Sequence, residues 1–114
     1  MITLYGIKNC DTVKKAQKWL EKQNIDYKFH DFRQDGLEKK LVQSWIATLG
    51  WEEVVNKRST TWKNLDNSTR DTLNETTVVS TVLEQPTLIK RPVLTSEKQI
   101  LIGFNEADYA ALLL

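Results

Sequence analysis

Cysteine and histidine are nearly absent from this sequence, which contains one of each, Cys10 and His30. A single cysteine cannot form an intramolecular disulfide bond. The two residues together cannot complete a Cys/His zinc site either, because such a site needs about four ligands. We therefore expect no bound metal and no resident cofactor, and we expect Cys10 to act alone or with a second molecule.

The chain also lacks an excess of charge of one sign and any long apolar run. Sixteen lysines and arginines face fifteen aspartates and glutamates, for a net charge of +1, which argues against direct binding of nucleic acid. No stretch approaches the roughly 20 apolar residues of a membrane span, and the first residues do not resemble a secretory signal. We therefore expect a cytoplasmic protein without a membrane partner, in a compartment that keeps a free thiol reduced.

The 114 residues are 40% hydrophobic and 27% charged, which is typical of a globular protein. This length suits one domain with a sizeable core. No linker, internal repeat or low-complexity segment interrupts the sequence. We therefore expect a single domain over residues 1–114.

The first third of the chain predicts a strand, a helix and a second strand. Residues 2–5 form a short apolar run, and residues 25–30 alternate between apolar and polar side chains. Between them, apolar side chains recur every three or four residues over 11–23, as in an amphipathic helix. Cys10 then lies at the amino end of this helix. A strand, helix and strand in this order form a βαβ unit with parallel strands.

The middle of the chain predicts helices. Residues 37–49 have the clearest helical spacing, with Asp35 and Glu38 placed as a capping box before it. Residues 51–65 favour short helical turns. In residues 76–83, strand propensity competes with helical spacing, and we favour a helix because the spacing of the apolar residues decides more than propensity.

The last quarter predicts a β-hairpin and a final helix. Two apolar runs, residues 88–94 and 99–102, are separated by a four-residue turn, and Asn105 is placed to cap the helix that follows. The overall order is therefore β-α-β, a helical block, and β-β-α. This is the α/β order of the thioredoxin-like fold, with a helical insertion over about residues 37–85, and the order alone leaves other α/β folds open.

Cys10 is the residue best suited to chemistry. A thiol is nucleophilic only as the thiolate, and the free N–H groups and dipole at a helix amino terminus stabilise an anion. The polar neighbours of Cys10, which are Lys8, Asn9, Asp11 and Thr12, argue against a buried, inert cysteine. Val13 occupies the position of the second cysteine in a Cys-x-x-Cys motif, so the resolving thiol has to come from another molecule.

Two arginines are candidates for binding an anionic group. Arg58 lies in a polar loop and Arg91 precedes Pro92, and a guanidinium group donates paired hydrogen bonds to a carboxylate or oxyanion. Pro92 lies where an edge position or a cis peptide bond is favoured. We interpret His30 as a structural or solvent-facing residue rather than as an acid–base partner of Asp31.

Four segments of the sequence together resemble the ArsC/Spx family. They are Leu4 to Thr12, Arg58 with Ser59 to Trp62, Pro86 to Pro92, and Gly103 to Asn105. The match keeps the same order over nearly the whole chain and is closest to the YffB branch. The resemblance implies a thioredoxin-like fold, a catalytic Cys10, anion-binding side chains at Arg58 and Arg91, and a cis peptide bond before Pro92 that faces the cysteine.

The resemblance leaves three functions open. The leading hypothesis is a glutathione-dependent thiol reductase, in which Cys10 attacks an oxidised substrate and glutathione or a glutaredoxin-like thiol donor resolves the disulfide. The second is an Spx-like regulator that binds the carboxyl-terminal domain of the RNA polymerase α subunit; Val13 removes the second cysteine of the switch often found in those regulators. The third is arsenate reduction. Glutathione-coupled arsenate reductases carry a third arginine after the hairpin, where this sequence has Gly103-Phe104-Asn105.

Overall fold

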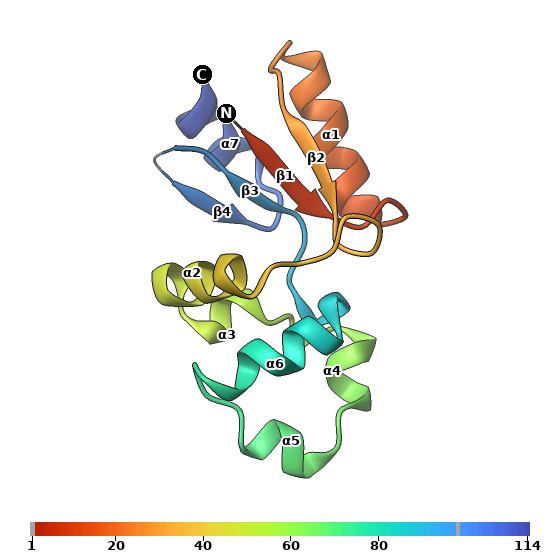
Figure 1. Cartoon of the computed structure of the whole chain (residues 1–114). Coiled ribbons are helices and arrows are strands. Elements are labelled where there is room, and N and C mark those ends of the chain that lie inside the picture. The colour runs from red at the N-terminus through yellow and green to blue at the C-terminus, as the bar shows by residue number, and fades with distance from the viewer. Residues whose placement is uncertain (1, 98) are drawn as a thin grey trace. The chain divides into compact units, whose positions relative to one another are not determined.

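The computed structural model of the chain describes residues 2–97 and 99–114 and divides into two compact units (Figure 1). The first unit comprises Met1–Gly36 and Arg91–Leu114, and the second comprises Leu37–Lys90. The second unit is the helical block that the sequence places at about residues 37–85. No helix among the described residues combines the length and the apolar character needed to cross a membrane.

The first unit is a four-stranded sheet with two helices. Its elements are β1 (Thr3–Gly6), α1 (Asp11–Lys22), β2 (Lys28–Asp31), β3 (Val93–Thr95), β4 (Ile100–Ile102) and α7 (Glu106–Leu113). The strand order is β2-β1-β3-β4. The β1 and β2 strands are parallel, whereas β3 is antiparallel to both β1 and β4. The predicted βαβ unit, the hairpin and the final helix are thereby confirmed.

Two predicted strands are shorter than expected. The prediction for β2 began at residue 25, but the Ile25 N–H still donates to the Leu20 carbonyl oxygen at 3.0 Å. The chain is therefore leaving α1 at that point, and β2 starts at Lys28. The predicted strand over 88–94 is wrong in its first half. A short 3₁₀ helix, η1 (Pro86–Leu88), comes first, and β3 follows at Val93.

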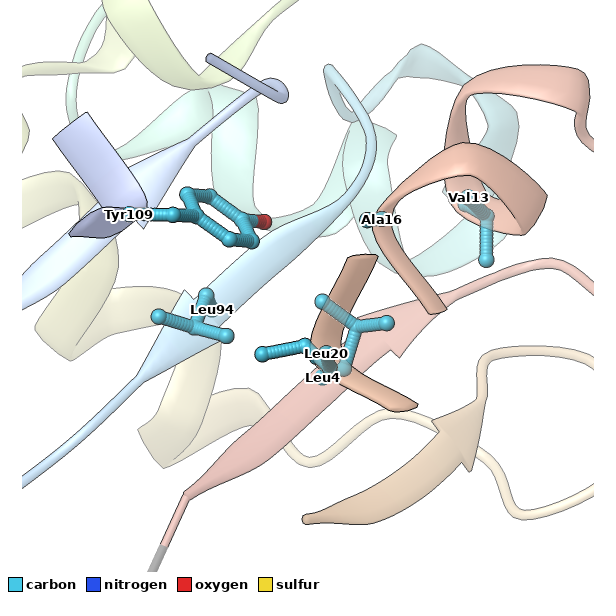
Figure 2. Close-up of a cluster of buried hydrophobic side chains, with 6 residues drawn as sticks. All are labelled: Leu4, Val13, Ala16, Leu20, Leu94 and Tyr109. Atoms are coloured by element: carbon cyan, nitrogen blue, oxygen red, sulfur yellow. The ribbon is translucent and has the colours of Figure 1, made fainter. Parts of the chain in front are cut away.

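The core of the first unit lies between the sheet and both of its helices (Figure 2). Leu4 and Leu94 lie opposite each other on β1 and β3. The α1 side chains in this core follow the predicted helical spacing, and α7 adds one large ring. The six core side chains are fully buried: Leu4, Val13, Ala16, Leu20, Leu94 and Tyr109. Because one cluster joins residues of α1 and α7 to the central strands, both helices cover the same face of the sheet.

The hydroxyl group of Tyr109 is buried in this core without a hydrogen-bond partner in the described part of the chain. Burial raises the pKa of Tyr109 far above its ordinary value of 10.0. The ring makes edge contacts with Trp19 and Phe104, with centroid distances of 5.8 and 4.9 Å. The ring therefore contributes packing, while the hydroxyl group adds a desolvation cost.

Replacing Tyr109 with phenylalanine should therefore raise the free energy of unfolding by about 1 kcal/mol, because the unpaired hydroxyl group is removed and the ring contacts remain. Urea denaturation at neutral pH measures this change. Tyr109→Ala is the matched control and should lower stability by about 3–5 kcal/mol, because it empties the ring's volume. A less stable Tyr109→Phe variant would show that the hydroxyl group has a favourable partner.

The second unit consists of helices. They are α2 (Lys39–Leu49), α3 (Trp51–Val54), α4 (Thr60–Asn64), α5 (Asn67–Asp71), α6 (Thr77–Glu84) and η1. The helix predicted over 76–83 is confirmed, and three valines of α6 are buried on it. Gly50 ends α2 with a φ of 86°, a conformation that favours glycine.

The predicted capping box before α2 is wrong. Glu38 is the N-cap residue and its side chain makes no capping hydrogen bond. Asp35 instead accepts a hydrogen bond from the Asp31 N–H at its Oδ2 atom, at 3.0 Å. The helix consequently begins at Lys39, two residues later than predicted, because the acidic side chain that would cap it is engaged in the turn after β2.

Candidate functional site

Cys10 is the N-cap residue of α1, as predicted. Its backbone is extended, with φ −90° and ψ 125°, and its side chain makes no capping hydrogen bond. The Cys10 N–H donates to the Ile7 carbonyl oxygen at 3.2 Å, and the Cys10 carbonyl oxygen accepts the Lys14 N–H at 3.0 Å. The thiol is partly exposed. It therefore lies at a helix amino terminus without a side-chain cap, where Asp11 adds one acidic side chain to the first turn.

The polar neighbours of Cys10 are exposed. Lys8 and Asn9 precede it in the loop after β1, and Thr12 lies in the first turn of α1. An ammonium group and two uncharged polar groups are thus available on the loop and helix that hold the thiol, beside the exposed carboxylate of Asp11. The structure places these three predicted residues in the same unit as Cys10, and their roles in binding stay predictions.

Close packing at Gly6 fixes the start of α1 against the end of β1. A Cβ atom at Gly6 would lie 2.6 Å from the Cγ2 atom of Val13, a distance that side chains do not tolerate. Val13 is fully buried in the first turn of α1. The absence of a side chain at residue 6 therefore lets the turn that follows Cys10 rest directly on the strand.

Gly6→Ala should destabilise the protein by about 1–3 kcal/mol, since the added methyl group overpacks this contact. It should also slow thiol modification of Cys10, because the first turn of α1 has to move. The double variant Gly6→Ala with Val13→Ala tests the cause by urea unfolding. We expect its loss of stability to be smaller than the sum of the two single losses. Strictly additive losses would contradict this contact.

Asp31 anchors the loop that carries Cys10. It lies at the end of β2 and only 3% of it is exposed. Its Oδ2 atom accepts the Lys8 N–H at 3.1 Å. Its Oδ1 atom accepts the N–H groups of Arg33 and Gln34 at 2.7 and 3.1 Å. One buried carboxylate therefore joins the cysteine loop to the turn after β2.

The ionised form of Asp31 is favoured by these bonds. Burial by itself raises the pKa of a carboxyl group, but the N–H donors from Arg33, Gln34 and Lys8 outweigh it. As a result, the pKa of Asp31 lies below its ordinary value of 3.8. A carboxylate that accepts several backbone N–H bonds is expected to behave in this way. Asp31 is therefore a charged anchor at neutral pH.

Sequence reasoning missed this role of Asp31. The available signal was an acidic residue at the end of a strand with a polar run beginning two residues later, at Arg33, which is typical of an Asx turn. The interpretation of His30 as a structural residue agrees with its contacts. Its Nε2 atom lies 2.7 Å from the Gly36 carbonyl oxygen, and its ring lies 4.9 Å from the ring of Tyr5.

The Arg91-Pro92 peptide bond is cis, as predicted. Val93 pairs with Tyr5 in the antiparallel register of β3 and β1, so Pro92 lies beside the carboxyl end of β1. The loop to Cys10 leaves from that same end. Pro92 is buried and Arg91 is partly exposed. The pairing of β1 with β3 therefore brings Arg91, Pro92 and the cysteine loop to the same end of the sheet.

Arg58 belongs to the second unit. It is exposed in the turn before α4, and its N–H donates to the Asn56 Oδ1 atom at 3.0 Å. The preceding residue, Lys57, places its ammonium group over the rings of Trp51 and Trp62, at 5.4 and 5.7 Å from their centroids. These contacts hold the turn that presents Arg58. A joint site of Arg58 and Cys10 stays a prediction.

The segments that lead to the two arginines are paired with each other inside the second unit. Val55 and Ile89 form an antiparallel bridge. The Asn56 N–H donates to the Leu88 carbonyl oxygen, and the Lys90 N–H donates to the Val54 carbonyl oxygen, both at 2.8 Å. The backbone just before Arg58 and the backbone just before Arg91 are therefore tied together.

The three residues after the hairpin have structural roles. The Gly103 N–H donates to the Pro92 carbonyl oxygen at 2.8 Å. Phe104 packs its ring against Tyr109, and the Asn105 side chain accepts the Asp108 N–H as the cap of α7. Within residues 2–97 and 99–114, no three His, Cys, Asp or Glu side chains are grouped as a metal site requires.

Three relatives are similar to this chain over nearly its whole length. An uncharacterized protein of Haemophilus influenzae is 54% identical over 97% of both chains. The regulatory protein MgsR of Bacillus subtilis is 33% identical over 94% of this chain and 86% of its own. The global transcriptional regulator Spx of Streptococcus pyogenes is 28% identical over 99% of this chain and 85% of its own.

Solved structures confirm the thioredoxin-like fold. A YffB protein is 40% identical and matches with a TM-score of 0.97 over all of both chains. An arsenate reductase of Vibrio cholerae, 18% identical, has a TM-score of 0.83 over 98% of this chain and 97% of its own. A glutaredoxin of Archaeoglobus fulgidus, 16% identical, has a TM-score of 0.53 over 98% of this chain and 84% of its own. The last two show the fold alone.

The family follows from the sequence as well as from the fold. The model of the ArsC family matches residues 5–112. This range contains the cysteine loop, both arginines, the cis-proline and most of α7. The chain is a member of the ArsC family.

Proposed function

We propose that this ArsC-family protein is a thiol-dependent reductase in which Cys10 is the nucleophile and glutathione is the resolving thiol. One observation supports this most. The only cysteine of the chain is partly exposed at the amino terminus of α1, and no side chain caps that terminus. Such a position leaves the sulfur accessible to a substrate beside unpaired backbone N–H groups, and the sequence supplies no second thiol to resolve a disulfide.

The proposed reaction reduces a mixed disulfide between a substrate thiol and glutathione. The Cys10 thiolate attacks the glutathione sulfur, the old S–S bond breaks, and the substrate leaves as a thiolate that takes a proton from water. A second glutathione, as its thiolate, then attacks the glutathione sulfur bound to Cys10. This step releases glutathione disulfide and regenerates the Cys10 thiolate. Over both steps, one mixed disulfide and one glutathione thiol become one substrate thiol and one glutathione disulfide, so the substrate sulfur is reduced and the sulfur of the second glutathione is oxidised.

The surrounding groups have distinct roles in this proposal. The first-turn N–H groups of α1 and the hydroxyl group of Thr12 stabilise the thiolate, and Lys8 adds positive charge. Arg91, at the end of the sheet that carries the cysteine loop, binds a carboxylate of glutathione. Arg58, in the turn before α4, also binds a carboxylate of glutathione. Asp31 acts as a positioning residue, because it holds the Lys8 N–H.

Intact-mass measurement after treatment with oxidised glutathione tests the first step. We expect one glutathione adduct per chain on the unmodified protein and none on Cys10→Ser, which is a complete control because it removes the only thiol. Arg91→Lys, which keeps the charge but removes the paired donors, should slow adduct formation. An unmodified wild-type protein would refute the proposal.

A regulatory function is the second candidate, and the similarity to MgsR and Spx favours it. In this alternative the chain binds the carboxyl-terminal domain of the RNA polymerase α subunit and catalyses nothing. Its net charge of +1 is compatible with a protein contact and gives little attraction to DNA. Retention of that domain by the immobilised protein supports this candidate, and no retention refutes it.

Arsenate should not be a substrate. Two arginines remain of the three that the family resemblance assigns to an arsenate site, and residues 103–105 have structural roles. Loss of one charge-assisted contact with a small oxyanion corresponds to a weakening of about ten- to a hundredfold. Coupled turnover with arsenate, glutathione and glutaredoxin should stay at the background rate. Clear turnover would contradict this expectation.

A further inference from the structure

A groove in the first unit is lined by side chains of α1 and by residues at and just before the start of α7. Its volume is about 390 Å³. Nothing in the proposed thiol chemistry uses it. The residues that matter for its chemistry are Lys15, Lys18, Trp19, Lys22, Phe104 and Glu106.

The three lysines form one row on α1. Lys15, Lys18 and Lys22 are three and four residues apart, so they lie on one face of the helix, and all three are exposed. At about 1.5 Å of rise per residue, the row covers roughly 10 Å, in steps of about 4.5 and 6 Å. A single small anion is too short to contact the whole row.

Two aromatic rings make the apolar part of the groove. Trp19 and Phe104 are partly exposed, and each holds an edge-to-face contact with the buried ring of Tyr109. These contacts fix both rings against the core, so an apolar side chain can pack on them with little loss of side-chain entropy. The groove thus combines a row of cations with a rigid apolar surface.

The charge of the groove is concentrated. Three lysines and one acidic residue, Glu106, contribute charge to its lining, so its net positive charge exceeds the +1 of the whole chain. A local field of this kind selects an acidic partner. The small charge of the chain as a whole gives little counterion release, which disfavours a nucleic acid as the occupant.

We propose that this groove binds an extended acidic segment of a partner protein, with carboxylates against the lysine row and an apolar side chain against Trp19 and Phe104. An extended peptide places alternate side chains about 6.6 Å apart on one side, which is close to the step of about 6 Å between Lys18 and Lys22 along α1. The proposal is independent of the thiol chemistry, because none of these residues belongs to the proposed catalytic machinery.

Fluorescence anisotropy with a labelled peptide of alternating glutamate and leucine tests the proposal on the full chain. We expect saturable binding, and no binding of the matched peptide in which glutamine replaces glutamate. The variant Lys15→Gln, Lys18→Gln, Lys22→Gln should weaken binding about tenfold, since each exposed ion pair contributes a factor of about 1.5 to 5. Trp19→Leu should weaken it as well, because the apolar contact shrinks.

The matched control removes the same charge elsewhere. Lys14, Lys28 and Lys40 are exposed and do not line the groove, so their triple glutamine variant should bind the peptide nearly as well as the wild type. Equal weakening in both triple variants would overturn the proposal, because it would show attraction without a site. Displacement of the peptide by single-stranded DNA, or self-association of the chain that the groove variant abolishes, would overturn it too.

The Cys10→Ser variant separates this proposal from the thiol reductase. We expect it to bind the acidic peptide as the wild type does, although it forms no glutathione adduct. Absence of peptide binding with intact adduct formation would overturn the groove alone. Peptide binding without an adduct on the wild type would overturn the reductase alone.

Discussion

Cys10→Ser should reduce glutathione-coupled disulfide reduction to the uncatalysed rate, a loss of about 10³-fold or more. The sequence contains no other thiol, and a serine hydroxyl group stays protonated at neutral pH, so no nucleophile remains at the start of α1. Initial rates with a glutathionylated peptide as substrate and excess glutathione measure the loss.

The control for this variant is a measurement of its stability, which shows that it is folded. Serine is a favoured N-cap residue, so Cys10→Ser should unfold in urea at the same concentration as the wild type or slightly above it. Substantial residual turnover in a purified, folded variant would place the nucleophile outside the protein and would contradict the assignment of Cys10.

Asp31→Ala should lower the free energy of unfolding by about 3 kcal/mol, because the N–H groups of Lys8, Arg33 and Gln34 lose a shared, buried acceptor. The same change frees the cysteine loop, so formation of the glutathione adduct should slow as well. Urea denaturation and the adduct rate measure the two effects. Asp35→Ala is a useful control, because its carboxylate is exposed and accepts only the Asp31 N–H among the bonds described here.

The role of Asp31 also predicts a pH dependence. The pKa of Asp31 is lower in the folded protein than its ordinary value of 3.8. Its ionisation therefore contributes stability that is fully present above about pH 4 and is lost as the pH falls through the folded pKa. The side chain of Asp31→Asn does not titrate. The difference in free energy of unfolding between this variant and the wild type should therefore shrink below about pH 4. If this difference in free energy of unfolding stayed constant down to the pH at which the protein unfolds in acid, it would contradict the claim that ionised Asp31 stabilises the fold.

Local patterns predicted most of the fold because they act within a few residues. The spacing of Val13, Ala16 and Leu20 predicts α1 and its buried face. The same kind of spacing correctly predicts a helix over residues 76–83, where the residue types alone favour a strand. The errors concern element ends. The Asp35 carboxylate accepts a hydrogen bond in the turn after β2 instead of capping α2. Which of these two bonds forms depends on how the chain folds back after β2, which local sequence patterns do not show.

The candidate site was predicted in part. The position of Cys10 at the head of a helix followed from its place between a strand and an amphipathic pattern, and the cis bond before Pro92 was expected from the family resemblance. The anchoring role of Asp31 was not predicted, because it depends on a contact with Lys8 across 23 residues of sequence. The need for glycine at residue 6 was likewise not predicted, because it depends on how closely Val13 packs against the Gly6 backbone.

The central claim is that the thiol which resolves Cys10 arrives on another molecule. A single-turnover experiment tests it most directly: the purified mixed disulfide of Cys10 with glutathione is mixed with reduced glutathione and followed by intact-mass measurement. We expect complete return to the unmodified protein, with one glutathione disulfide released per chain. A mixed disulfide that persists with excess glutathione would contradict it.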